Sequence, residues 1–328
     1  MPSGYGGGGL DVISTVLMLE ALGEGCADNG FTLGVNGQIW AVQEPILTFG
    51  DETQKSKFLP GLCDGSLVGA HGMTEVATGS DAFNLQTTAQ AADGGYLLNG
   101  QKTLIGMAPA CDLALIFAST NPELKQWGVS AFIVEAESEG FNRGPLQEKM
   151  GLRTVPMGQI SLKDCWVPAE NRLGPEGAGS SIFQNTMEWE RSFIFSSHVG
   201  SMQRQLDACI EFAHERSVFG QPIEGYQSVS NRLANMKLRL ETSRLLLYRA
   251  AWLKQQGMPA ATEAALTKLH ISESFVESSM EAIRIHGGRG YLSTYEIERD
   301  LRDAMGGVIY SGTSDIQRQI IARMLKDG

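Results

Sequence analysis

The chain has 328 residues, of which 42% are hydrophobic and 19% are charged, the proportions of an ordinary globular protein rather than a disordered one. Its formal net charge of −11 repels phosphate backbones, which argues against a nucleic-acid-binding protein. The five cysteines are widely spaced and form no CxxC pair, so we expect buried thiols in a reducing compartment rather than disulfides or zinc ligands.

The first 65 residues are predicted to be helical. Apolar residues recur at helical spacing from Leu10 to Leu22, and Gly23 is expected to end the first helix. A further helix should end before Gly50, where the polar run DETQKSK begins another. The N-terminus lacks the basic and apolar regions of a signal peptide, and no stretch reaches the roughly 18 apolar residues of a membrane span. We therefore expect a cytoplasmic protein.

The pattern changes after residue 65 and changes again after residue 172. Residues 66–172 contain short β-branched or alternating runs separated by turn signals such as ADGG and ESEG, which predicts a compact β domain. From residue 173 to residue 328 the helical period returns, with one apolar stripe that includes Ile210. Short links rich in glycine or proline separate these segments, which is typical of an antiparallel helical bundle.

Six segments of the chain resemble signatures of the acyl-CoA dehydrogenase family. They occur in the family's order and are MTEVATGSD (73–81), KMGLRTVPMGQISLKDCWVPAENRLG (149–174), ERSVFGQPIEGYQSV (215–229), IHGGRGYL (285–292), ERDLRDA (298–304) and IYSGTSDIQRQIIARML (309–325). The resemblance implies an α+β fold with an N-terminal helical domain (1–65), a middle β-barrel-like domain (66–172) and a C-terminal four-helix bundle (173–328). The family places about one helical hairpin before GYGGGG, so the N-terminal domain is expected to be shortened.

The activity that this resemblance implies is FAD-dependent α,β-dehydrogenation of an acyl thioester. In that chemistry a carboxylate removes the α-proton while a hydride leaves the β-carbon for the flavin. The thioester carbonyl must be polarised by hydrogen-bond donors, because charge develops on its oxygen.

The resemblance also implies which residues bind FAD. These positions are Met73, Thr74, Gly79, Ser80, Ile105, Gly106, Arg216, Phe219, Gln227, Gly287, Gly288, Thr313 and Asp315. Arg216 and its neighbours would hold the pyrophosphate and adenosine half, often of a flavin in a neighbouring subunit. Three ordinary alternatives stay open: a plain turn or helix N-cap at GSD, a surface arginine paired with Glu215 or Glu224, and a helix C-cap at the GGxG stretch.

The catalytic base departs from the usual family pattern. The family carries it as the glutamate of YEGT, and here that position is Ser311, which cannot act as a carboxylate. In the isovaleryl and long-chain branches the base is a glutamate just before an arginine on the preceding helix, which corresponds to Glu190 before Arg191. We therefore predict Glu190 as the base, with Glu188 as the second candidate. An ordinary helical glutamate paired with a cation is the alternative.

The substrate prediction follows from the same comparison of motifs. Ser80, Arg191, Ser311 and Gly312 are implied to line the substrate site. The family's WITN stretch reads Leu104-Ile105-Gly106-Met107 here, so a hydroxyl beside the flavin is absent.

Glu190, YSGT and LIG together resemble the branch that oxidises aminoacyl groups, such as prolyl, on acyl- or peptidyl-carrier proteins in secondary metabolism. The alternatives are a short or branched-chain acyl-CoA dehydrogenase, a flavin oxidase or monooxygenase, and a non-catalytic homologue. An electron-transferring flavoprotein is a possible partner, no metal is expected, and the family pattern implies a homo-oligomer, either a dimer or a tetramer.

Overall fold

The computed structural model describes residues 1–327 and divides into two compact units. The sheet unit contains Met1–Leu10, Gly37–Glu148 and Val155–Glu190. The bundle unit contains Asp11–Asn36, Lys149–Thr154 and the chain from Arg191 onward. The predicted N-terminal segment 1–65 is thus shared between the two units.

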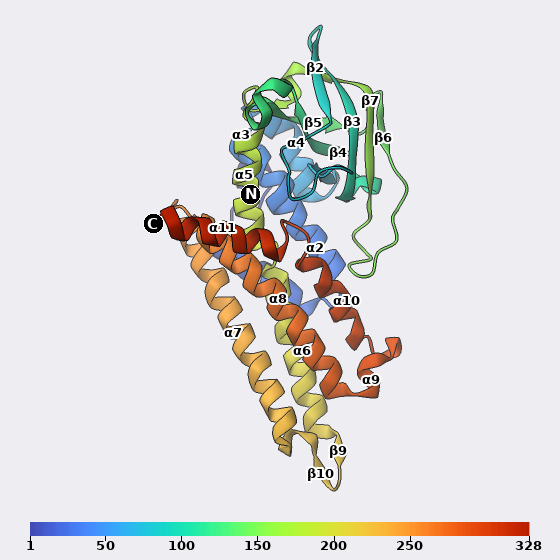
Figure 1. Ribbon diagram of the computed structural model, residues 1–328, viewed down its shortest axis with the longest axis vertical. Coiled ribbons are helices and arrows are strands. Elements are labelled where there is room, and N and C mark those ends of the chain that lie inside the picture. Colours follow the sequence, from blue (N-terminus) through green and yellow to red (C-terminus); the bar gives the residue numbers. More distant parts are fainter. Residues whose placement is uncertain (328) are drawn as a thin grey trace. The chain divides into compact units, whose positions relative to one another are not determined.

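The sheet unit is built on one eight-stranded sheet. Its strands are β1 (Gly69–Gly72), β2 (Thr88–Ala92), β3 (Gly95–Gly106), β4 (Leu113–Ser119), β5 (Val129–Glu135), β6 (Phe141–Arg143), β7 (Met157–Pro168) and β8 (Arg172–Leu173). They lie in the order β6-β7-β3-β2-β4-β5-β8, and β1 pairs with β4 in parallel (Figure 1). The predicted β-rich segment is confirmed.

Strand β4 explains why this sheet holds two hydrophobic cores. Every residue of β4 is buried, and alternate side chains point to opposite faces. Ala114 and Ile116 join one core, while Leu115 and Phe117 join the other. The second core is covered by the helical segments η2 (Gln38–Gln43), α3 (Glu44–Phe49), α4 (Glu52–Asp64) and α5 (Gly179–Phe193).

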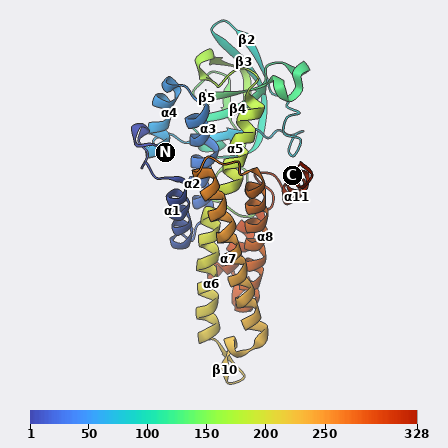
Figure 2. The ribbon, with the colours of Figure 1, turned by 90° about the vertical axis from the view of Figure 1, so that its left-hand side faces the viewer.

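The bundle unit is helical. Its main elements are α1 (Val12–Gly25), α2 (Asn29–Gly37), α6 (Ser196–Glu215), α7 (Gln227–Gln255), α8 (Ala261–His286), α9 (Gly288–Tyr291), α10 (Ile297–Gly307) and α11 (Ser314–Asp327). The long helices α6, α7 and α8 run side by side, and a short hairpin of β9 (Ser217–Val218) and β10 (Gln221–Pro222) joins α6 to α7 (Figures 1 and 2). The predicted helical bundle is confirmed.

Gly23 does not end the first helix, and that prediction is wrong. Helix α1 continues to Gly25 because Gly23 is needed for packing rather than for termination. A Cβ atom at Gly23 would lie 1.8 Å from the carbonyl oxygen of Ser197 on α6. On α6, a Cβ at Gly200 would lie 1.9 Å from the carbonyl oxygen of Glu20. The two glycines therefore let the backbones of α1 and α6 approach closely.

Helix capping and side-chain burial test the remaining predictions about the helices and the cysteines. Helix α3 ends before Gly50, and Asp51 starts α4 with a capping box to Gln54, as expected. The predicted stripe on α6 is wrong at Ile210, which is 46% exposed. All five cysteines are free thiols, three of them buried and two half-buried. Among the described residues, no helix combines the length and apolar character needed to cross a membrane.

Candidate functional site

Glu190 lies near the C-terminal end of α5, in the sheet unit. One residue before it, Trp189 stacks on Trp40 of η2, with the ring centroids 5.8 Å apart, which fixes how this turn of α5 faces its surroundings. The Glu190 side chain is 12% exposed, and its Oε2 lies 4.0 Å from Nδ1 of His71 on β1. The predicted base is thus a largely buried carboxylate beside an imidazole. Glu188 is half-buried on the same helix.

The YSGT turn, in the bundle unit, is held by two side chains. Nε of Arg191 donates to the carbonyl oxygen of Ser311 at 3.0 Å, and Nε2 of Gln317 donates to that of Gly312 at 3.0 Å. Ser311 and Gly312 have φ angles of 56° and 87°, in the left-handed region. The structure therefore brings three predicted substrate residues together and adds Gln317. Gln317 shows no sequence signal beyond its place on the helix after the turn.

The loop after β1 closes around a buried ion pair that no sequence pattern indicates. Nζ of Lys102 lies 2.8 Å from Oε1 of Glu75 and also donates to the carbonyl oxygen of Met73 at 3.2 Å. The carboxylate of Glu75 accepts from the backbone N–H groups of Gln86 and Thr87. Burial alone would raise the pKa of Glu75, but Lys102 and these N–H groups hold it below its ordinary value. Burial lowers the pKa of Lys102 to about 8.

This closure sets the predicted flavin-binding segments of the sheet unit side by side. The backbone N–H of Thr103, on β3, donates to the carbonyl oxygen of Thr74 at 2.9 Å. The side chains of Met73 and Ile105 are buried, so a cofactor contact from either residue would use main-chain atoms. Leu104 is 60% exposed at a register shift in the pairing of β3 with β7, just before Gly106.

Gly79 and Ser80 offer hydrogen-bond donors to a ligand. Both residues are exposed, and within residues 1–327 their backbone N–H groups donate to no protein acceptor. No helix begins at this segment, so it is not the N-cap of a helix. The two N–H groups and the Ser80 hydroxyl together suit an acceptor-rich ligand.

The link from α6 to α7, which contains the β9–β10 hairpin, carries three further predicted cofactor residues. Arg216 directly follows α6, Phe219 is 98% exposed at the hairpin tip, and Gln227 begins α7. Glu224 lies 2.9 Å from His214 rather than pairing with Arg216. In the described part of the chain the exposed guanidinium of Arg216 makes no ion pair, so it is available for a diphosphate.

Gly287 and Gly288 lie at the same end of the bundle as the hairpin. Phe212, in the last turn of α6, stacks on His286, the last residue of α8, with ring centroids 4.4 Å apart. Gly287 has a φ of 58° and directly follows α8, so it does cap that helix. A Cβ atom at Gly287 or Gly288 would meet nothing within 4 Å, which leaves open space beside both.

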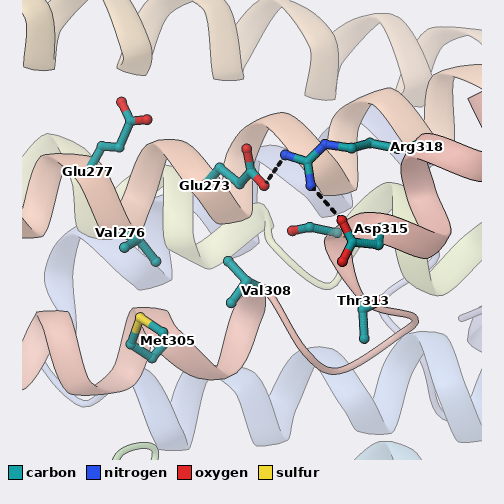
Figure 3. A pocket seen from close by; sticks show the side chains of 9 residues that line it. Glu273, Val276, Glu277, Met305, Val308, Thr313, Asp315 and Arg318 are labelled. Carbon is teal, nitrogen blue, oxygen red and sulfur yellow. Dashed lines mark hydrogen bonds and ion pairs between the residues drawn. The ribbon is translucent and has the colours of Figure 1, made fainter. Parts of the chain in front are cut away.

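Thr313 and Asp315 lie elsewhere, at a cavity of about 390 Å³ between α8, α10 and α11 (Figure 3). Asp315 pairs with Arg318 at 3.1 Å, and Arg318 also pairs with Glu273 at 2.5 Å. With Glu277, the rim carries three carboxylates and one guanidinium. Carboxylate oxygens accept hydrogen bonds from hydroxyl groups, so this rim suits a ribose better than a phosphate.

The cofactor residues of the bundle unit therefore form two separate groups. Glu277 of the cavity and Gly287 of the hairpin end are ten residues apart on α8, which corresponds to about 15 Å along the helix. One group offers Arg216 and open glycine backbone, and the other offers Thr313 and carboxylates. The first group suits the diphosphate of a flavin dinucleotide, and the second suits a ribose. Within one copy of the bundle, the two groups lie apart.

Comparison with known proteins shows which family the chain resembles. Three family models match: the acyl-CoA dehydrogenase N-terminal domain over residues 1–66, the middle domain over 70–165 and the C-terminal domain over 177–326. The chain is 45% identical to an L-prolyl-[peptidyl-carrier protein] dehydrogenase of Pseudomonas fluorescens, over 99% of this chain and 86% of that protein. It is 42% identical to the protein of the same name from a Serratia species, over 98% and 83%.

Solved structures give the same result. The prolyl acyl carrier protein oxidase AnaB matches with a TM-score of 0.98 and 45% identity, over 99% of this chain and 86% of that one. The complex of PigA with FAD and proline matches with a TM-score of 0.97 and 41% identity, over 99% and 85%. The chain belongs to the acyl-CoA dehydrogenase family.

Proposed function

We propose that this protein is an FAD-dependent dehydrogenase that removes two hydrogens across the α and β carbons of an aminoacyl thioester, with a prolyl-like group on a carrier protein as substrate. The observation that carries the proposal is the identity of 45% and 42% to two prolyl-carrier-protein dehydrogenases over nearly the whole chain. The structure of PigA with FAD and proline supports the same cofactor and acyl group.

Glu190 is the proposed base. When bound, the flavin supplies the acceptor for the hydride, and the protein supplies position and proton transfer. A carboxylate with a side chain 12% exposed is weakly hydrated, which favours proton abstraction from a carbon acid. Ser311 has no ionisable group to offer, and its backbone carbonyl is held by Arg191. In this proposal the YSGT turn therefore shapes the substrate site rather than abstracting the proton.

The residues proposed to hold FAD are those that the motifs predict. Thr74, Gly79, Ser80 and the backbone of Ile105 and Gly106 would bind the flavin end. Arg216, Phe219, Gln227, Gly287 and Gly288 would bind the pyrophosphate and adenosine half, with Thr313 and Asp315 at a ribose. About 15 Å of α8 separates the Arg216 group from the Thr313 group. We therefore propose that the Arg216 group of one copy binds the FAD of another copy, in a homo-oligomer. The boundaries after residues 65 and 172 remain our proposed domain limits.

The electron acceptor is a second question, and one observation favours oxygen. AnaB, at 45% identity, is named an oxidase. Here Leu104, Ile105 and Gly106 place no side-chain hydroxyl beside the proposed flavin position. The alternative acceptor is an electron-transferring flavoprotein. Oxygen uptake during turnover, compared with reduction of a purified electron-transferring flavoprotein, distinguishes the two.

Substrate choice is tested by anaerobic bleaching of the protein-bound flavin. L-prolyl thioester on a peptidyl-carrier protein should bleach the flavin absorbance faster than butyryl-CoA or isovaleryl-CoA at equal concentration. If only the CoA thioesters bleach it, the protein is a short- or branched-chain acyl-CoA dehydrogenase. Colourless purified protein that takes up no added FAD would indicate a non-catalytic homologue and contradict the proposal.

A further inference from the structure

His71 lies directly beside the proposed base, on a different element. It is held in β1, where the backbone pairs in register with Leu115 of β4. Its ring packs against Phe117 and Phe183, with centroids 5.3 Å and 5.9 Å away, and its Nδ1 lies 4.0 Å from Oε2 of Glu190. Both side chains of the His71–Glu190 pair are 12% exposed. A rigid strand thus presents a ring nitrogen to the carboxylate on α5.

A polar ring at this position is costly for the fold. Nε2 of His71 is buried without a hydrogen-bond partner among the described residues. Leaving such an atom unsatisfied lowers stability, because the loss of its hydrogen bonds to water is not compensated. A phenylalanine or leucine would fill the space between Phe117 and Phe183 without that cost. Buried unsatisfied groups of this kind call for an explanation other than packing.

The ring is neutral at physiological pH. Burial, and then the positive charge of Lys102, lower the pKa of His71 to about 4. The other charged groups on the surrounding elements are Glu75, which pairs with Lys102, Glu44 on α3, and Glu188, Glu190 and Arg191 on α5. A neutral imidazole carries one N–H, and the carboxylate of Glu190 is the acceptor that faces Nδ1.

We propose that His71 is a positioning residue for the base: the N–H at Nδ1 faces the Glu190 carboxylate and holds it in the orientation that proton abstraction needs. This inference rests on the proposed function, in which Glu190 is the base. The separation of 4.0 Å is about 1 Å longer than a hydrogen bond. Catalytic hydrogen bonds are often long before substrate binds and shorten in the complex. A neutral donor at the carboxylate also favours its charged form and so counteracts burial.

Three substitutions at position 71 test the proposal. His71→Phe keeps an aromatic ring and removes the donor. His71→Asn places an amide N–H close to the position of Nδ1, and His71→Gln places one near the position of Nε2. The rate of anaerobic flavin reduction by the L-prolyl carrier thioester is measured for each variant from pH 5 to pH 9, with FAD content as the measure of correct folding.

The proposal predicts that His71→Phe moves the acidic limb of the pH profile upward by about one unit, because the charged form of the base then loses a hydrogen-bond donor. The same variant should lower the maximal rate with little change in KM. His71→Asn should restore the wild-type profile, and His71→Gln should resemble His71→Phe. If His71→Phe does not fold, the proposal is tested by whether the pH profiles of His71→Asn and His71→Gln differ.

Equal profiles for His71→Asn and His71→Gln, or a wild-type profile for His71→Phe, would overturn the role of His71. The proposed function fails separately: in that case the wild-type flavin is not reduced by the prolyl thioester, or Glu190→Gln is reduced as fast as the wild type. If Glu190→Gln abolishes reduction while all three His71 variants behave as the wild type, only the present inference is lost.

Discussion

At the scale of single residues, the proposed chemistry depends on Glu190, whose carboxylate lies beside the ring of His71. Glu190 stands out because Ser311 removes the usual carboxylate and a Glu-Arg pair occurs at an alternative position. His71 could not be found in this way, since one histidine in a short strand produces no motif and no periodicity. Its place beside Glu190 depends on how β1 and α5 pack, and 119 residues separate the two in the chain.

His198, in the bundle unit, makes stability depend on pH. Burial, and then the charge of Arg204, lower its pKa from the ordinary 6.5 to about 4. Between pH 4 and pH 6.5 the unfolded chain binds a proton at this residue and the folded chain does not. The free energy of unfolding therefore falls on acidification through this range, by up to about 1.4 kcal/mol per pH unit from this residue.

Urea unfolding at several pH values checks this expectation. His198→Gln should flatten the loss of stability below pH 6.5, although His71 contributes a similar term that remains. The control is His214→Gln, because the side chain of His214 is 74% exposed. Equal flattening by the two variants, or none by His198→Gln, would contradict a neutral buried His198.

At the scale of elements, most strands and helices follow from pattern, whereas packing decides the exceptions. The apolar run of β4 was readable from the sequence. Strands β6 and β8 have three and two residues, too few to show alternation. The prediction that Gly23 ends α1 is wrong because sequence alone does not show whether a glycine ends a helix or lets a second helix approach closely.

The close approach of α1 and α6 gives a prediction with a matched control. Gly23→Ala should lower the free energy of unfolding by about 1–3 kcal/mol, because its Cβ would overlap the backbone of Ser197. Gly25→Ala, in the same helix, has nothing within 4 Å of its Cβ and should be neutral or stabilising by up to about 1 kcal/mol. Thermal unfolding measures both, and a Gly23→Ala protein as stable as the wild type would contradict the packing described.

The loop between β1 and β2 depends on the Lys102–Glu75 ion pair. Removing one member leaves the other charge buried, so Lys102→Met should cost about 3–5 kcal/mol. The double variant Lys102→Met, Glu75→Gln removes both charges and should recover part of that loss. Urea unfolding of the wild type and the three variants measures the coupling. If the two single losses simply add in the double variant, the pair does not stabilise this loop.

At the scale of the whole molecule, the resemblance of motifs identified the family, but it could not show how the cofactor residues are distributed. Arg216 and Thr313 are both assigned to FAD by motif, and the bundle places their groups about 15 Å apart along α8. That separation depends on the length of α8 and on which other helix ends lie beside each of its ends. Sequence periodicity predicts helix length, but it does not predict which helix ends lie side by side.

A site shared between copies predicts complementation. Arg216→Met should weaken FAD binding, since the guanidinium binds two oxygens and methionine binds none. Glu190→Gln should abolish flavin reduction. Co-expression of the two variants should restore part of the activity, because a mixed oligomer contains one site with both wild-type residues. Arg249→Met, at a side chain 67% exposed on α7, is the control for loss of an arginine. Mixed samples without activity would contradict a shared site.

The most direct measurement of the central claim is the rate of anaerobic flavin reduction by L-prolyl carrier thioester in Glu190→Gln, with Glu188→Gln as its neighbour on the same helix. Both proteins should bind FAD with the spectrum of the wild type. We predict that Glu190→Gln reduces its flavin at least about 10²-fold more slowly, while Glu188→Gln stays within a few-fold of the wild type. Reduction at the wild-type rate in Glu190→Gln would show that the proton is removed by another group.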